Sequence, residues 1–302
     1  MPLPRRQLVS LDATRYYHCT SRCVRRAFLC GKDRFTGKSF EHRRQWLEDR
    51  LILLSDVFAI DLMAYAVMSN HYHVVVELKP EQASALSDDE VIERWGNLYN
   101  VPDVTSVSTI ATWRERLADL SWFMRCINEP LARRANREDH CKGRFWEGRF
   151  KSQALLDHKA LLTCMAYVDL NPIRAKIAKT PETSRHTSIK ARIESKAEHL
   201  VPFRDSSNVN ESTAPICLHD YLLLVDWTGR QLRRGKRGRI SSREPPILSR
   251  LGIEPERWVD EMRHYGRWDY RAVGSVQALA TLCEHLGQCW LKGAGKRRLA
   301  HD

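Results

Sequence analysis

The chain has 302 residues, with 49 Lys and Arg against 37 Asp and Glu, and a formal net charge of +12. Apolar residues make up 43% and charged residues 28%, a composition typical of globular rather than disordered or fibrous proteins. No run approaches the roughly 18 apolar residues of a membrane-spanning helix, and the N-terminus lacks the apolar core of a secretory signal. We therefore expect a soluble, cytoplasmic protein with no membrane partner.

The positive charge is unevenly distributed along the chain. Residues 1–50 carry twelve basic and five acidic side chains, a net charge of +7, whereas residues 51–100 carry two basic and eight acidic ones, a net charge of −6. A polyanion such as nucleic acid is the natural partner of the basic parts, because each phosphate contact releases counterions. A protein with a merely basic surface would show the same total, so charge alone leaves both interpretations open.

Nine cysteines are scattered along the chain, and none of them forms a CxxC pair. An odd, unpatterned set in a chain without a secretory signal is typical of reduced thiols rather than of a disulfide framework. The spacing of Cys19, Cys23 and Cys30 fits no standard zinc template.

The first elements in chain order alternate between strand and helix patterns. Residues 15–20 are rich in β-formers and predict a strand, and residues 41–54 place apolar side chains at helical spacing. Residues 58–78 are largely apolar and are interrupted at Ser69–Asn70. This pattern predicts two buried strands joined by a tight turn.

Two helices are expected next. Residues 113–137 carry one apolar face, with Pro130 expected to kink or divide the helix. Residues 157–170 predict a second helix with Asp157 as its N-cap, ending or bending before Pro172. The order β-α-β-β-α-α favours an α+β fold, in which an antiparallel sheet carries helices on one face.

A polar stretch at 205–215 is the best candidate for a linker. We expect a first domain over 1–180, a linker over 181–215 and a mainly helical C-terminal region over 216–302. Within this region, residues 230–239 include six basic residues. We expect this segment to contact DNA, and the alternative is a disordered loop. The region is compatible with a helix-turn-helix or with a helical cap on the first domain.

The stretch Met68-Ser-Asn-His-Tyr-His-Val74 contains two histidines separated by one residue. In a strand, His71 and His73 project from the same face while Tyr72 points the other way. Two imidazoles on one face make half of a metal site. An isolated pair of this kind is more often structural, so the pattern needs support from elsewhere in the chain.

Tyr167 and Asn171 form the second candidate pair. They are four residues apart, so a helix places them on one face. A tyrosine hydroxyl beside a bound metal could attack a phosphodiester, and the amide carbonyl of Asn171 could complete the ligand set. The alternative is that Tyr167 packs between helices and Asn171 caps a helix end.

Three stretches taken together, in this order, resemble one family. They are Met68-Ser-Asn-His-Tyr-His-Val74, Gly143-Arg-Phe-Trp-Glu-Gly-Arg-Phe-Lys151 and Tyr167-Val-Asp-Leu-Asn-Pro-Ile-Arg-Ala175. The chain resembles the single-tyrosine HUH transposases, and among them the REP-associated tyrosine transposases. The likeness spans roughly residues 14–180, and residues 17–22 are similar to the first strand of the family.

The resemblance implies a ferredoxin-like or RRM-like catalytic domain that nicks single-stranded DNA. His71 and His73 match the histidines that hold a divalent metal, Mg²⁺ or Mn²⁺, and Asn171 matches the third ligand. Tyr167 matches the nucleophile, which would form a 5′-phosphotyrosine and release a 3′-OH able to rejoin DNA. Tyr72 departs from the pattern, because the family usually carries an apolar residue at that position.

The resemblance also implies DNA that is partly single-stranded and partly folded into hairpins of palindromic repeats. The expected contacts are basic residues, which would bind phosphates, and one aromatic residue, which would stack on unpaired bases. The candidates are Arg5, Arg6, Arg15, Arg22, Arg25, Arg26, Arg144, Trp146, Arg149 and Lys151. Both a monomer and a homodimer are compatible with the family.

Three other interpretations compete with this one. A catalytically decayed relative would act as a sequence-specific nucleic-acid binder or regulator, although all four expected site residues are present. A replication initiator or relaxase would share the chemistry, but such proteins present the nucleophile in other sequence surroundings. A nucleotide-dependent enzyme has little support, because residues 293–296 lack the spacing of a phosphate-binding loop.

Overall fold

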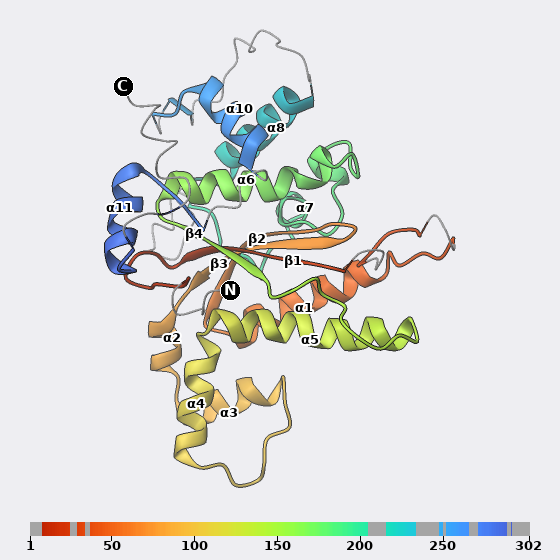
Figure 1. Cartoon of the computed structure of the whole chain (residues 1–302), viewed down its shortest axis with the longest axis vertical. Coiled ribbons are helices and arrows are strands. Elements are labelled where there is room, and N and C mark those ends of the chain that lie inside the picture. The colour runs from red at the N-terminus through yellow and green to blue at the C-terminus, as the bar shows by residue number, and fades with distance from the viewer. Residues whose placement is uncertain are drawn as a thin grey trace.

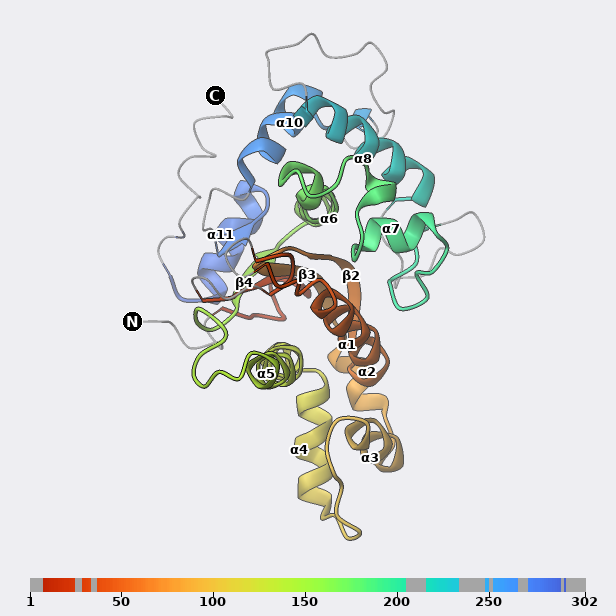
Figure 2. The same ribbon diagram turned by 90° about the vertical axis from the view of Figure 1, so that its right-hand side faces the viewer.

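A sheet of five strands lies at the centre of the protein, with helices packed on both of its faces (Figures 1 and 2). The computed structural model describes residues 8–24, 29–33, 37–204, 216–233, 248–249, 252–265, 271–288 and 291. The strands are β1 (Tyr16–Arg22), β2 (Ile60–Val67), β3 (His71–Leu78), β4 (Lys151–Leu155) and β5 (Ala272–Val273). The long helices next to the sheet are α1 (Arg43–Val57), α5 (Leu120–Glu138) and α6 (His158–Arg174).

The strand order in the sheet is β2-β3-β1-β4-β5. The first four strands pair antiparallel, and the short β5 joins β4 in parallel. The strand predicted over 15–20 is therefore confirmed as β1, and the strand pair predicted over 58–78 is confirmed as β2 and β3. The expected α+β class, built on an antiparallel sheet, is also confirmed.

Helices cover both faces of this sheet, whereas the sequence led us to expect one covered face. In β3, Val74 and Val76 belong to the apolar core beneath α1 and α5, and Val75 belongs to a second core beneath α6. A strand with consecutive buried valines is apolar on both sides, and each side needs its own cover. Figure 2 shows α6 on one side of the sheet and α1 and α5 on the other.

The long helix expected over 113–137 is two helices, α4 (Val107–Leu117) and α5. Asp119 begins α5 by accepting a 2.8 Å hydrogen bond from the backbone nitrogen of Trp122. Pro130 lies inside α5 without dividing it. The carbonyl of Cys126, four residues before the proline, accepts a 2.8 Å hydrogen bond from Arg50 Nε instead of a helical N–H.

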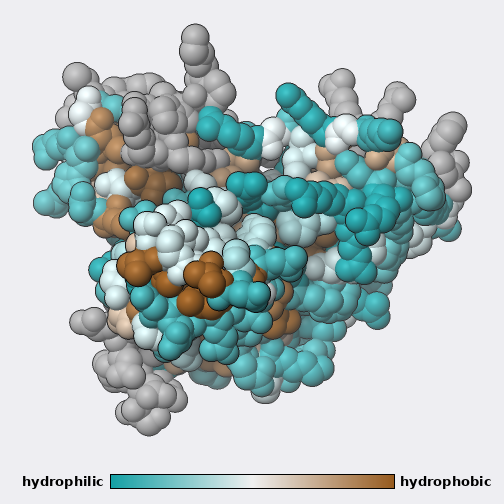
Figure 3. All heavy atoms as spheres, turned by 90° about the horizontal axis from the view of Figure 1, so that it is seen from below, coloured by the Kyte–Doolittle hydropathy of each residue, from teal (hydrophilic) through white to brown (hydrophobic). Residues whose placement is uncertain are grey.

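Three short helices form a lobe that projects from the sheet between β3 and α5 (Figure 1). They are α2 (Pro80–Ala85), α3 (Asp88–Gly96) and α4, and the sequence analysis did not predict the first two. Trp95 and Trp113 stack at the centre of the lobe, with ring centroids 5.5 Å apart. Val104 and Val107 are exposed near its tip, and apolar residues gather on this side of the molecule (Figure 3).

The helix that carries Tyr167 is α6. Asp157 caps it as predicted, accepting a 2.8 Å hydrogen bond from the backbone nitrogen of Ala160. The helix does not end before Pro172 but continues to Arg174. Pro172 has no N–H to donate to the carbonyl of Val168, one turn earlier. Ala175 closes the helix by donating to the carbonyl of Asn171.

The C-terminal region wraps around α6. The segment expected as a linker, residues 181–215, is folded up to residue 204. It contains η2 (Pro181–Thr183) and α7 (Ser188–Ile193). Residues 205–215 lie outside the described residues. Beyond it come α8 (Leu218–Arg233), α10 (Pro255–His264) and α11 (Val276–His285), and residues 234–239 of the basic segment are also outside the description. In Figure 1, α8 and α10 cover α6, as a helical cap would.

Asp169 joins two helices, α7 and α8, to α6. It is fully buried and accepts hydrogen bonds from Ser188 Oγ at 2.5 Å, the backbone nitrogen of Ile189 at 2.9 Å and Tyr221 Oη at 2.5 Å. The N-terminus of α7 and the side of α8 are thus attached to the helix that carries Tyr167.

Eight cysteines of the described chain are free thiols, and no described helix is both long and apolar enough to cross a membrane.

Candidate functional site

His71 and His73 lie on the face of β3 that is turned toward α6. Their ring centroids are 4.9 Å apart. Tyr72 points to the opposite face, where its hydroxyl donates a 2.8 Å hydrogen bond to Asn128 Oδ1. The alternation expected of a strand therefore places the two imidazoles side by side and directs Tyr72 away from them.

Tyr167 and Asn171 project from α6 toward the same histidines. The Nδ2 atom of Asn171 is 3.0 Å from Nε2 of His73, and the rings of Tyr167 and His73 have centroids 5.7 Å apart. The structure thus brings together the two pairs of residues that the sequence singled out, although about one hundred residues separate them in the chain.

The distance between Asn171 and His73 suits two ligands of one metal ion. In octahedral coordination with bonds of about 2.1 Å, adjacent ligand atoms are about 3 Å apart. The oxygen and nitrogen of the Asn171 amide are interchangeable by rotation, so its carbonyl oxygen can occupy the same place. The donor set therefore fits a divalent ion that accepts both nitrogen and oxygen ligands.

One ring nitrogen of His71 is hydrogen-bonded within the protein, as is usual for histidines that bind a metal through the other nitrogen. Its Nδ1 lies 2.6 Å from Asn70 Oδ1, which holds a proton on Nδ1 and leaves Nε2 with a free lone pair. Within the described chain, no group of three or more His, Cys, Asp or Glu side chains is arranged to hold a metal. Asn171 is a side chain beside His73 whose amide oxygen could serve as a third ligand.

Burial keeps these imidazoles uncharged at neutral pH. It lowers the pKa of His71 to about 4, helped by the nearby Arg22, and it lowers the pKa of His73 well below the ordinary value, helped by His18. The neutral imidazole is the form that binds metals.

Arg174 is a residue that the sequence analysis did not single out. Its guanidinium carbon lies 4.9 Å from the centroid of the Tyr167 ring, and it donates hydrogen bonds to the backbone carbonyls of Met262 (2.6 Å) and Arg263 (3.1 Å). Burial raises the pKa of Tyr167, and the charge of Arg174 opposes this rise. Arg174 follows Tyr167 by seven residues, which places both on the same face of a helix. This spacing could have identified Arg174 from the sequence.

Only part of the predicted DNA-binding set lies close to the candidate site formed by His71, His73, Tyr167 and Asn171. Arg22 ends β1 directly opposite His71 and is exposed. Arg15 forms a 2.6 Å ion pair with Glu81, which compensates its charge. Four candidates lie outside the described residues: Arg5, Arg6, Arg25 and Arg26.

The remaining candidates lie in the segment after α5 and at the first residue of β4. Three of them are exposed basic residues: Arg144, Arg149 and Lys151. Trp146 is partly buried, packs against Tyr72 with ring centroids 5.7 Å apart and donates a 2.9 Å hydrogen bond to the carbonyl of Asn128. Because Tyr72 points away from the histidines, Trp146 lies on the opposite side of the sheet from Tyr167.

Comparison with known proteins returned one solved structure and no sequence match. Neither a protein family nor a curated protein matches the chain in sequence. The chain is similar to a REP-associated tyrosine transposase whose structure was solved bound to a REP hairpin. The TM-score is 0.40 at 15% sequence identity, and the match covers 72% of this chain and 99% of that one.

Three further side chains adjoin the site, and the sequence analysis did not predict them. His18 of β1 lies 2.9 Å from His73, from ring nitrogen to ring nitrogen, and is buried. Gln153 of β4 is its cross-strand partner. Tyr265, which follows α10, packs against Tyr167 with ring centroids 4.7 Å apart. His18 lies within residues 17–22, which are similar to the first strand of the transposase family. No sequence pattern indicated Tyr265.

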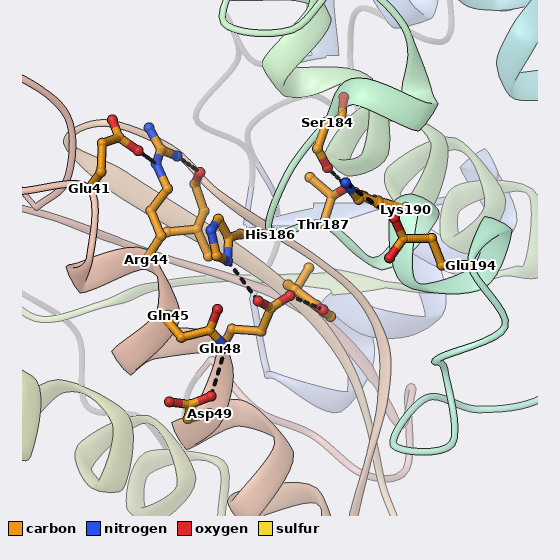
Figure 4. A network of polar contacts seen from close by, with 12 residues as sticks. Glu41, Arg44, Gln45, Glu48, Asp49, Ser184, His186, Thr187, Lys190 and Glu194 are labelled. Carbon is orange, nitrogen blue, oxygen red and sulfur yellow. Dashed lines mark hydrogen bonds and ion pairs between the residues drawn. The ribbon is translucent and has the colours of Figure 1, made fainter.

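A second polar cluster lies at the edge of the sheet, beside β2 (Figure 4). Glu48 of α1 accepts hydrogen bonds from His186 Nδ1 at 2.6 Å and from Tyr65 Oη at 2.7 Å. The three residues line a pocket of 490 Å³ between α1 and α7. The loop before α7 pairs with the end of β2, where Val67 N donates to the carbonyl of His186 at 3.1 Å. This end of the edge strand is therefore covered.

Proposed function

We propose that this chain is a metal-dependent endonuclease and strand transferase for single-stranded DNA. It would cleave at hairpin-forming palindromic repeats through a 5′-phosphotyrosine intermediate, as in DNA transposition. The observation that carries the proposal is the meeting of Tyr167 and Asn171 of α6 with His71 and His73 of β3. The three sequence stretches that resemble the single-tyrosine HUH transposases support the same conclusion.

His71, His73 and Asn171 are the residues that would hold Mg²⁺ or Mn²⁺. Such an ion, when bound, offsets negative charge on the oxygens of the scissile phosphate. The three side chains come from two elements that pack directly on each other, so their positions are set by the fold. All of them, and Tyr167, belong to one chain, so one copy carries a complete set.

Tyr167 supplies the nucleophile. Its oxygen forms a bond to phosphorus while the bond from phosphorus to the 3′ oxygen of the preceding nucleotide breaks. The tyrosine loses its hydroxyl proton and the departing 3′ oxygen gains one, so the step exchanges one phosphodiester for another. Because that bond energy is conserved, the 3′-OH of another strand can reverse the step without ATP.

Arg174 supports the loss of the tyrosine proton. A phenol at its reference pKa of about 10 is protonated at neutral pH, and burial of Tyr167 makes ionisation harder still. The guanidinium near the ring favours the charged phenolate and partly offsets that burial. A fixed cation beside a group that gains negative charge in the reaction stabilises the transition state.

The DNA would approach from the exposed side of the site. Arg22 ends β1 beside His71 and is the basic residue best placed to meet a phosphate there. Trp146 packs against Tyr72 on the opposite face of the sheet, so we assign phosphate contact at this site to Arg22 and no base stacking there to Trp146. Phosphate contacts of this kind position the strand without reading its sequence.

The test uses the full chain and a panel of hairpin oligonucleotides with single-stranded flanks. With Mn²⁺, the wild type should form a covalent protein–DNA species that survives denaturing electrophoresis, and EDTA should abolish it. Tyr167→Phe should form none, whereas the control variant Tyr72→Phe, which removes a hydroxyl on the opposite face of the sheet, should retain it. A stable complex without any covalent species would support the decayed binder or regulator instead.

A further inference from the structure

The ring of His73 is held from both sides. Its Nε2 faces the Asn171 amide at 3.0 Å, and its Nδ1 faces His18 Nε2 at 2.9 Å. The rings of His18 and His73 are stacked, with centroids 5.1 Å apart, and both side chains are buried. His18 therefore stands behind His73, on the side away from the proposed ligand position.

His18 has a partner of its own. Gln153 lies directly opposite it on β4, and the two side chains are hydrogen-bonded. Since Nε2 of His18 is engaged by His73, Nδ1 is the nitrogen available to Gln153. Tyr265 Oη donates a 3.0 Å hydrogen bond to Gln153 Oε1, which links this pair to the residue after α10.

The hydrogen bonds that connect Tyr265, Gln153, His18 and His73 can all be formed when each donates in the same direction along the row. A neutral imidazole has one N–H and one bare nitrogen. The carbonyl oxygen Gln153 Oε1 accepts from Tyr265 and has a second lone pair, so it can accept from His18 Nδ1–H as well. The Nε2 of His18 is then bare and accepts from His73 Nδ1–H, which leaves the Nε2 lone pair of His73 directed at Asn171.

We propose that His18 is a positioning residue that holds His73 in the tautomer with a bare Nε2, and that Gln153 and Tyr265 hold His18 in turn. The C-terminal region thereby takes part in the site, because Tyr265 belongs to the segment beyond 216. The tautomer itself is a property of the folded chain alone. Its consequence, readiness of His73 to bind metal, rests on the proposed function.

The direct test is the protonation of the His73 ring in the full chain, free of metal and DNA. In protein labelled with ¹⁵N at histidine, the two ring nitrogens give different shifts according to which one carries the proton. The His73 signals are assigned by their loss in His73→Gln. Wild type should show a protonated Nδ1 and a bare Nε2, and a proton on Nε2 would overturn the proposal.

The variants then ask whether His18 is the cause. His18→Leu removes the acceptor and should shift His73 toward the other tautomer, whereas His18→Gln places an amide near the lost Nε2 and should restore the wild-type pattern. If His18→Leu does not fold, Gln153→Leu serves instead, because it frees His18 to reverse its own donor and acceptor. An unchanged His73 tautomer in the folded variants would refute the positioning role.

Mn²⁺ titration separates this proposal from the proposed function. Loss of a hydrogen-bonding partner behind a metal ligand typically weakens binding by about 10- to 100-fold, and His18→Leu should show that loss with recovery in His18→Gln. If the tautomer responds as expected while wild type binds no Mn²⁺ and forms no covalent species, the proposed function fails and the positioning role stands. Wild-type Mn²⁺ affinity that His18→Leu leaves unchanged would contradict the positioning role.

Discussion

The amide nitrogen of Asn171 lies 3.0 Å from Nε2 of His73, across the interface between α6 and β3. Neither residue marks a site alone, since one is a polar residue near a helix end and the other a buried histidine on a strand. Their contact turns two sequence patterns into one possible ligand set. It depends on α6 continuing past residue 170, because Asn171 must share a helical face with Tyr167.

Replacing Asn171 tests whether it acts as a ligand. Asn171→Leu should weaken Mn²⁺ binding by about 10-fold or more, because it removes the oxygen ligand while roughly preserving volume. Asn171→Asp keeps an oxygen in the same place and should bind at least as well as wild type. Isothermal titration of the full chain measures both. Equal affinity in the Leu variant would exclude Asn171 from the ligand set.

Arg174 should matter for rate rather than for metal binding. Arg174→Met removes the cation near Tyr167 and should slow formation of the covalent species by about 100-fold or more, the scale of losing one electrostatic stabiliser. Arg174→Lys retains the charge and should lose less. Single-turnover assays with saturating hairpin DNA measure the effect. A normal rate in Arg174→Met would mean that the guanidinium only fastens α10.

Asp169 should be important for stability. Asp169→Ala leaves the buried donors of Ser188, Ile189 and Tyr221 without their acceptor and should cost about 3 kcal/mol or more. Asp169→Asn keeps one acceptor oxygen and should cost less, and Tyr221→Phe should cost about 2 kcal/mol. Urea unfolding of each variant gives these values. A loss below about 1 kcal/mol in Asp169→Ala would contradict the linking role.

Glu48 predicts a dependence of stability on pH. Burial raises the pKa of Glu48, but hydrogen bonds from His186 and Tyr65 outweigh it and bring the net pKa below 4.5. A lowered carboxyl pKa adds stability that is present above the unfolded value and is lost as pH falls through the folded one. The stability difference between wild type and Glu48→Gln should therefore shrink below pH 4.5. A constant difference down to pH 3 would refute it.

Local periodicity correctly predicted which candidate residues share a face of a strand or helix. Two-residue spacing placed His71 and His73 on one face, and four-residue spacing did the same for Tyr167 and Asn171. Neither pattern could give the distance between the two elements, which depends on packing of α6 against the sheet. The consecutive valines at 74–76 already indicated a strand buried on both sides, and that signal would have predicted the second helical layer.

Other features had weaker or no sequence signals. The start of α3 was detectable, because Ser87 and Glu90 form a capping box, with Ser87 Oγ accepting from Glu90 N and Glu90 Oε2 accepting from Ser87 N. Tyr265 was not detectable, because its contacts with Gln153 and Tyr167 follow from α10 folding back over α6. Contacts between segments so far apart leave no periodic pattern in the chain.

The most direct test of the central claim is to identify the residue that carries the DNA. Trypsin cuts after Lys159 and Arg174, and the resulting peptide, residues 160–174, contains Tyr167 as its only tyrosine. After digestion of the covalent species with trypsin and nuclease, mass spectrometry should find the nucleotide phosphate on this peptide. Finding it on another peptide, such as residues 264–267 with Tyr265, would contradict the assignment of Tyr167 as the nucleophile.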